Sequence, residues 1–123
     1  MDKIYIIEGD GFVAFDVKIK KNLLATSSEE TATKMCRILS DFVVNICIPR
    51  IREMIRAGKM NIDMRDYTLD EAFKYIPDGK DIFKNVCTPI LNSEQVDYLI
   101  EELTMKQIHC EPNGFYIKEL PII

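Results

Sequence analysis

Residues Ser27 to Ala57 read SSEETATKMCRILSDFVVNICIPRIREMIRA and form the longest amphipathic segment of the chain. Apolar residues recur there every three or four positions, which places them on one face of a helix. Because this is the largest apolar surface that the sequence offers, we expect the other elements to pack against it. The stripe comprises Ala32, Met35, Cys36, Leu39, Phe42, Val43, Ile46 and Cys47, and it resumes at Ile51, Met54 and Ile55.

Cap residues and a proline mark the limits of this helix. Ser27 and Glu30 have the spacing of a capping box, which predicts the N-terminus, and Gly58 predicts the C-terminus. Pro49 has no N–H, and its ring crowds the carbonyl four residues earlier. We therefore expect a kink or a break, with a second helix starting at Pro49. Because the apolar pattern continues across the proline, one kinked helix is the alternative.

The segment before the helix has the pattern of a β-hairpin. Residues 3–8 and 12–19 are rich in β-branched and aromatic side chains, and Gly9-Asp10-Gly11 between them predicts the turn. A second turn at 20–22 and a short third strand at 23–26 would lead into the helix. We expect the odd positions of the second run to face the core. These are Val13, Phe15, Val17 and Ile19.

Three shorter helices are predicted after Gly58. Residues 59–67 alternate like an extended segment. Thr68 and Glu71 have the spacing of a capping box and predict the start of the first of these helices. Asp81 predicts the start of the second, and Asn92 or Ser93 predicts the start of the third, which runs to about residue 106. The predicted inner faces of the first and last of these helices are Leu69, Ala72, Phe73 and Ile76, and Val96, Leu99, Ile100 and Leu103.

These elements predict an α+β fold in one domain, residues 1–123. An N-terminal antiparallel hairpin or meander packs on one long helix, kinked or broken at Pro49, and short helices follow. Pro112-Asn113-Gly114 predicts a C-terminal hairpin, which either extends the first sheet or forms a second one. The predicted core comprises Val13, Phe15, Leu39, Phe42, Val43, Ile46, Phe73, Leu99, Ile100 and Leu103.

Composition narrows the class of protein. The 123 residues carry 16 basic and 20 acidic side chains, and the net charge of −4 argues against a general nucleic-acid binder. No apolar run reaches the roughly 18–20 residues of a membrane span, and the N-terminus lacks the features of a secretory signal. We therefore expect a cytoplasmic protein without a membrane partner. Its cysteines are expected to be reduced, mostly buried thiols, namely Cys36, Cys47, Cys87 and Cys110.

No motif predicts a catalytic residue, a cofactor or a metal. Gly9-Asp10-Gly11 is too short for a phosphate-binding loop, and a strand is expected after it rather than a helix. His109 is the only histidine. Its neighbour Cys110 would point to the opposite face of a strand, so the two form a poor catalytic pair. We expect His109 to be an exposed or half-buried hairpin residue.

Two regions of single-sign charge are the candidate partner-binding sites. One is the outer face of the last predicted helix, and the other follows Pro49, where the spacing of Arg52, Arg56 and Lys59 predicts a shared helix face. Solvated surface is the plain alternative for both. The acidic residues are Glu94, Asp97, Glu101 and Glu102, and the basic residues are Arg50, Arg52, Arg56, Lys59 and Arg65.

The order of elements in roughly the last 55 residues resembles a winged-helix DNA-binding domain. In that arrangement the third helix enters the major groove and the hairpin forms the wing. Here the third helix, which would enter the major groove, is the last predicted helix. It carries the four acidic residues named above, which the DNA phosphates would repel. The resemblance is therefore one of topology, and it favours protein contacts or dimerisation over DNA binding.

Three functional hypotheses follow. The first is a small non-enzymatic protein-binding module, such as an accessory, adaptor or inhibitor protein that occupies a surface; phage-encoded inhibitors are one such group. If its partner binds nucleic acid, the acidic helix would mimic phosphates. The second is a nucleic-acid-binding regulator that uses the basic region or the winged-helix-like half. The third is an enzyme without a recognisable motif. A homodimer through unburied apolar surface is compatible with each.

Overall fold

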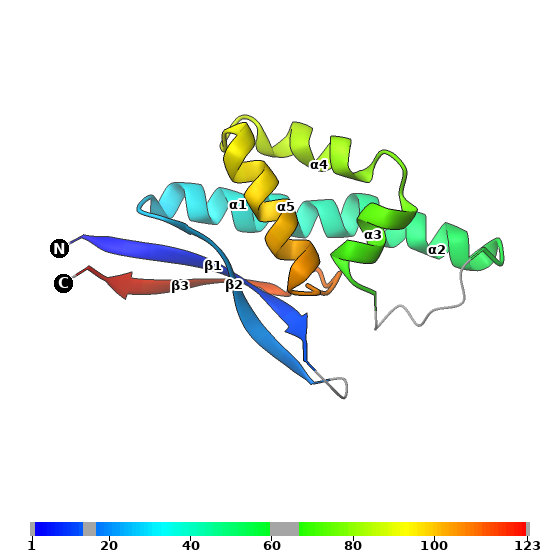
Figure 1. Ribbon diagram of the computed structural model, residues 1–123, viewed down its shortest axis with the longest axis horizontal. Helices are drawn as coiled ribbons and strands as arrows, with labels where there is room; N and C mark the ends of the chain where they lie inside the picture. Colours follow the sequence, from blue (N-terminus) through cyan, green and yellow to red (C-terminus); the bar gives the residue numbers. More distant parts are fainter. Residues whose placement is uncertain (1, 14–16, 60–66, 123) are drawn as a thin grey trace.

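The computed structural model describes residues 2–13, 17–59 and 67–122 and has the predicted α+β fold (Figure 1). A three-stranded antiparallel sheet lies beside one long helix, and three shorter helices gather on that helix. The two chain ends lie together at one end of the sheet. No helix in the described ranges is both long and apolar enough to span a membrane.

The sheet joins the two ends of the chain. β1 (Lys3–Phe12) lies between β2 (Lys18–Thr26) and β3 (Phe115–Pro121), and it pairs with both in antiparallel register. The N-terminal hairpin is therefore confirmed, and the C-terminal strand extends the first sheet, which was one of the two predicted arrangements. A register shift at Ile7/Glu8 leaves Leu23 as an extra residue in β2, and the Leu23 side chain is buried.

The predicted turn at Gly9-Asp10-Gly11 is wrong, because these residues lie inside β1. Their backbone is covered closely by the segment after the last helix. A Cβ on Gly11 would stand 2.7 Å from the Lys106 carbonyl oxygen, and one on Gly9 would stand 3.0 Å from Ile108 Cγ2. These glycines therefore permit a close backbone approach rather than a reversal of the chain.

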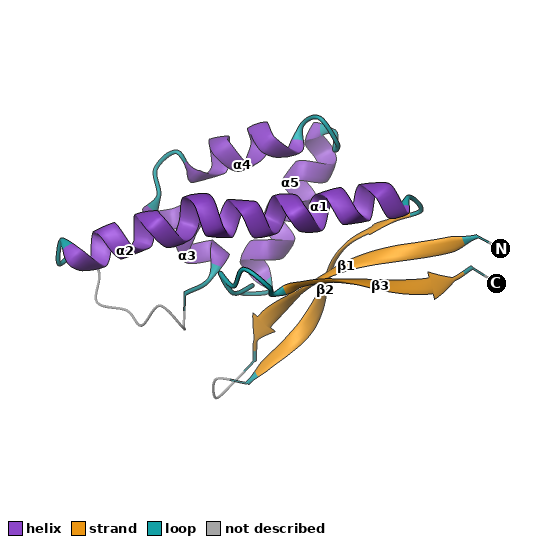
Figure 2. Cartoon of the chain, turned by 180° about the vertical axis from the view of Figure 1, so that it is seen from behind, coloured by secondary structure: helices purple, strands orange, loops and turns teal. Residues whose placement is uncertain are grey.

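β1 continues past the predicted turn, and this overturns the predicted core face of the second strand. The Val13 N–H donates to the Val17 carbonyl at 2.8 Å, and the ends of β1 and β2 beside these residues point away from the helices (Figures 1 and 2). Val13, Val17 and Ile19 are consequently exposed, and Phe15 lies outside the described residues. The predicted turn at 20–22 is part of β2.

The long helix is continuous past Pro49 (Figure 2). It consists of α1 (Glu29–Phe42), a π-helical turn η2 (Val43–Cys47) and α2 (Ile48–Arg56). The helix begins one residue later than predicted, because Ser28 is the cap and its hydroxyl accepts from the Thr31 N–H at 3.1 Å. It ends as predicted at Gly58, which has a φ of 70°.

The helices of the second half are α3 (Leu69–Tyr75), α4 (Gly79–Cys87) and α5 (Ser93–Met105). The predicted cap at Thr68 is confirmed, since its hydroxyl accepts from the Glu71 N–H at 3.3 Å, and the Glu71 carboxylate accepts from that hydroxyl at 3.3 Å. Asn92 caps α5, and Gln95 returns a bond to the cap backbone. The cap predicted at Asp81 is wrong, because α4 starts after Asp78. The predicted extended segment at 59–67 falls mostly on residues outside the described ranges.

The C-terminal hairpin does not form. Residues 107–111 make only isolated bridges, from Ile108 to Gly11 and from His109 to Thr68, while β3 pairs with β1. The described residues therefore contain no wing after α5. His109 is buried, contrary to prediction, because these bridges hold it under the Phe12 ring, 4.1 Å away between centroids.

One hydrophobic core joins the sheet and the helices. α1 contacts all three strands, and α5 contacts β2, α3 and α4. Ile46 is only partly buried at the edge of the core. The predicted core residues that are buried are Leu39, Phe42, Val43, Phe73, Leu99, Ile100 and Leu103.

Candidate functional site

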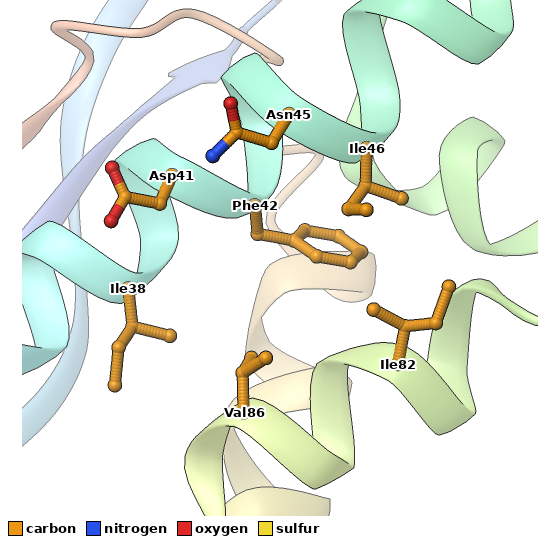
Figure 3. A pocket seen from close by; sticks show the side chains of 7 residues that line it. All are labelled: Ile38, Asp41, Phe42, Asn45, Ile46, Ile82 and Val86. Atoms are coloured by element: carbon orange, nitrogen blue, oxygen red, sulfur yellow. The ribbon is translucent and has the colours of Figure 1, made fainter.

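An apolar groove runs between the long helix and α4 (Figure 3). α4 lies beside the long helix in both overall views. The groove has a volume of about 340 Å³, near the lower limit for small-molecule sites. Its lining residues come from α1, from the π-helical turn and from α4, and they are Ile38, Asp41, Phe42, Asn45, Ile46, Ile82 and Val86.

The floor of the groove is anchored in the core by aromatic packing. The Phe42 ring is buried and lies 5.1 Å from the Phe83 ring and 5.9 Å from the Phe73 ring, and the latter two are 5.6 Å apart. Edge-to-face and tilted contacts at these distances are favourable and restrict the rings. The groove therefore has a fixed floor, with Val86 42% exposed at its wall.

The π-helical turn gives the groove its shape. The Ile48 N–H donates to the Val43 carbonyl, five residues earlier, in place of the usual four. Pro49 cannot donate at all, and in a regular α-helix its ring would press on the Asn45 carbonyl. The wider turn accommodates the proline and inserts one extra residue. Asn45 and Ile46, which belong to this turn, both line the groove.

The sequence carries a signal for this turn that periodicity counting missed. Five residues of the long helix are fully buried at a strict spacing of four, namely Met35, Leu39, Val43, Cys47 and Ile51. Each such step advances about 40° around a regular α-helix, so four steps would carry the stripe about 160° away from its start. All five can face one core only if the helix is locally underwound. The π-helical turn supplies that underwinding.

The polar groups of the groove are acidic or neutral. Asp41 and Asn45 lie together on the long-helix rim, above the apolar side chains that face α4 (Figure 3). Both are exposed, and no Lys or Arg lines the groove. Within the part of the chain that the structure describes, Asp41 makes no ion pair. Its carboxylate is therefore available to a cation of a bound partner.

The predicted basic residues do not form one free face. Arg50 makes a two-pronged ion pair with Asp78, at 2.6 and 3.2 Å, which holds the pKa of the Asp78 carboxyl below its ordinary value. Arg52 and Arg56 are exposed on α2. Lys59 is exposed beyond the helix end, where Gly58 redirects the chain, so it does not continue their helix face. Arg65 lies outside the described residues.

The predicted acidic residues lie on α5, away from the groove. Glu94 and Glu101 are exposed, and Asp97 stands 3.8 Å from Lys84 of α4. Glu102 is half-buried, and its ion pair with Lys106 at 2.8 Å holds the pKa of the Glu102 carboxyl below its ordinary value. Two of the four carboxylates therefore already have cationic neighbours.

The residues around His109 make structural contacts. The His109 backbone N–H donates to the Asp10 carbonyl at 2.8 Å, and its Nδ1 is 3.8 Å from Glu111 Oε1. The Tyr116 hydroxyl donates to the Asp10 carboxylate at 2.9 Å, which raises the pKa of Tyr116. These bonds tie the segment after α5 to β1, and none presents a nucleophile at a cavity.

The cysteines are free thiols, as predicted. Burial raises the pKa of Cys36 to about 11 and that of Cys87 to about 12. A hydrogen bond with Cys47, together with burial, also raises the pKa of Cys110. Thiols held in the protonated form are poor nucleophiles and poor metal ligands. Among the described residues no group of three or more His, Cys, Asp and Glu side chains is arranged to hold a metal.

Sequence reasoning missed the groove because its residues belong to two apolar stripes. Ile46 was predicted as core, and Ile82 and Val86 are among the apolar residues that follow the predicted cap at Asp81, so nothing in the sequence marked these three residues as partly exposed. Comparison of the chain with protein-family models, with curated proteins and with solved structures gives no match in any of the three.

Proposed function

We propose that this chain is a small non-enzymatic protein-binding module, an accessory, adaptor or inhibitor protein, and that it holds its partner at the groove between the long helix and α4. The observation that carries this proposal is the groove itself. It combines a fixed aromatic floor, two helical walls with four partly exposed aliphatic side chains, and a polar rim. That combination is typical of the centre of a protein interface, where apolar anchors are buried inside a polar ring.

The energetics favour a macromolecular partner. Apolar surface gains roughly 25 cal/mol per Å² when it leaves water, so a small molecule in this shallow groove would gain little after the cost of its immobilisation. A protein can cover the groove and the surrounding helix surfaces together, toward the roughly 1,600 Å² of a standard interface. Free thiols support a cytoplasmic site of action.

The test is an affinity capture from the lysate of the native host, with and without nuclease, using three forms of the tagged protein. They are the wild type, Val86→Glu inside the groove, and Val44→Glu as the matched control. Val44 lies on the long helix and is 44% exposed, close to the 42% of Val86 on α4. Unlike Val86, it does not line the groove. Circular dichroism and thermal melting verify that all three forms are folded.

We expect a stoichiometric protein that survives nuclease, remains with Val44→Glu and is lost with Val86→Glu. Equal recovery by all three forms would refute the groove as the binding site. Recovery that collapses with nuclease would refute the protein-binding module and support the nucleic-acid hypothesis, with Arg52, Arg56 and Lys59 as the residues to change next.

A further inference from the structure

We propose that the occupant of the groove is one amphipathic helix of the partner, with large apolar residues along one stripe and a Lys or Arg placed beside Asp41. This inference rests on the proposed function and names its partner chemistry. It follows from the backbone of the walls, from the length of the apolar lining, and from the charge of the rim.

The walls favour a helix over an extended segment. Both walls are helical, so most of their backbone N–H and C=O groups are bonded within the helices and are not offered to an occupant. The lining offers only Asp41 and Asn45 as polar partners. An extended peptide would bury unpaired backbone groups against aliphatic side chains, whereas a helix satisfies its own. Helix-in-groove docking therefore costs least here.

The length of the lining sets the size of the contact. On the long helix the aliphatic positions run from Ile38 to Ile46, a separation of eight steps along the chain, or roughly 12 Å at 1.5 Å per residue. Ile82 and Val86 form the opposite wall, one turn apart. About two turns of a partner helix fit this length, which corresponds to apolar anchors at i, i+4 and i+7.

The rim sets the charge of the flanking residues. Asp41 is exposed and makes no ion pair with the described residues, while the groove has no basic lining. A partner helix that carries Lys or Arg beside Asp41 gains an ion pair with this carboxylate, and a partner helix that carries Glu or Asp there is repelled by it. For a rim pair of this exposure we expect roughly a fivefold preference.

Two exposed helices of the chain itself, α5 and α2, do not fit this description. The exposed apolar residues of α5 are Tyr98 and Met105, seven residues apart, and they are flanked by the acidic residues Glu94 and Glu101, which Asp41 would repel. α2 exposes Arg52 and Arg56 but no large apolar side chain. Neither of these helices from a second copy is therefore a suitable occupant, and we infer that the helix belongs to another protein.

The experiment measures the binding of fluorescent 18-residue helical peptides by anisotropy. The peptides share an apolar stripe of Leu, Ile or Phe, and each is made with either Lys or Glu at the flanking positions. The protein forms are the wild type, Asp41→Lys, Val86→Glu and Val44→Glu. Glu94→Lys is the control for net charge, because it makes the same change at an exposed residue that does not line the groove.

We expect the Lys-flanked peptide to bind the wild type about fivefold more tightly than its Glu-flanked twin. Asp41→Lys should reverse this order, and Glu94→Lys should retain it. Val86→Glu should weaken both peptides more than tenfold, and Val44→Glu should change neither more than twofold.

Several results would overturn the inference. One is a charge preference that Glu94→Lys alters as much as Asp41→Lys does, and another is the absence of binding by every peptide. Sedimentation that shows a dimer of the wild type and a monomer of Val86→Glu would make a second copy the occupant. Each of these results leaves the proposed function standing if Val86→Glu still loses the partner in the affinity capture. A failure of this inference can therefore be distinguished from a failure of the proposed function.

Discussion

Replacement of Gly11 by alanine should destabilise the protein although it adds a single methyl group. The new Cβ would stand 2.7 Å from the Lys106 carbonyl oxygen and 2.8 Å from Lys21 Cδ. The lysine side chain can move, but the carbonyl belongs to a backbone segment whose next residues are bonded to β1. The Phe12 N–H donates to the Gln107 carbonyl at 3.2 Å, and the His109 N–H donates to the Asp10 carbonyl at 2.8 Å.

The magnitude follows from these contacts. Overpacking of this kind costs about 1–3 kcal/mol, and lengthening the two neighbouring hydrogen bonds adds up to about 1 kcal/mol for each. Alanine also restricts the backbone of the unfolded chain more than glycine does, and this stabilises the folded state by about 0.5–1 kcal/mol, which partly offsets the cost. We therefore expect Gly11→Ala to lower the free energy of unfolding by about 2 kcal/mol in urea titrations followed by circular dichroism.

Gly58 provides the contrast, because its constraint is conformational. It has a φ of 70° at the end of α2, and no atom lies within 4 Å of a Cβ built there. Gly58→Ala should cost about 1 kcal/mol, and Gly58→Asn should cost less, since asparagine adopts left-handed angles more readily. At Gly11 the order should reverse, with asparagine worse than alanine. An alanine at Gly11 as stable as wild type, or the same order at both positions, would refute the steric explanation.

Three further predictions concern the ion pair, the thiols and the π-helical turn. Asp78→Asn should reduce stability more at pH 7 than at pH 3, because the Arg50 contact lowers the pKa of Asp78 and its stabilising effect, present above the ordinary carboxyl pKa of about 4, is lost as the pH falls through the lowered value; urea titrations at both pH values, with salt reducing the difference, test this. Native protein at pH 8 should react slowly with DTNB and release all four thiols in guanidinium, because burial raises the thiol pKa values; two or more fast equivalents would contradict this. Deletion of Val44 should cost about 3 kcal/mol, because the proline then lies in a regular helix, and Pro49→Ala in the same chain should restore most of it; no recovery in the double variant would contradict the link between proline and turn.

The parts of the fold that could be predicted are those that neighbouring residues determine. The Thr68 cap, the inner face of α5 and the stop at Gly58 depend on side chains within one or two turns, and all were confirmed. Their residue types act through local hydrogen bonds and φ preferences, which a single sequence displays directly. The class of fold followed because these segments were correctly typed.

The errors share a different cause, which is pairing between distant segments. Gly9 and Gly11 have the composition of a turn, and only the approach of residues 106–108 explains them as strand residues. The Asn113-Gly114 signal marks a turn, but the strand after it pairs with β1, more than a hundred residues away. His109 is buried for the same reason. No local pattern encodes which partner a strand will find.

The groove could not be predicted because it arises from a conflict between two patterns in one helix. A strict four-residue spacing of buried side chains and a proline at position 49 are each unfavourable in a regular α-helix. One π-helical turn resolves both, since its underwinding brings the later buried side chains back toward the core and leaves room for the proline. Its extra residue moves Asn45 and Ile46 to the surface beside α4, where Asp41 already lies. The proline, the turn and the groove are therefore parts of one local arrangement, and this is why the groove, rather than either charged face, is the site to test first.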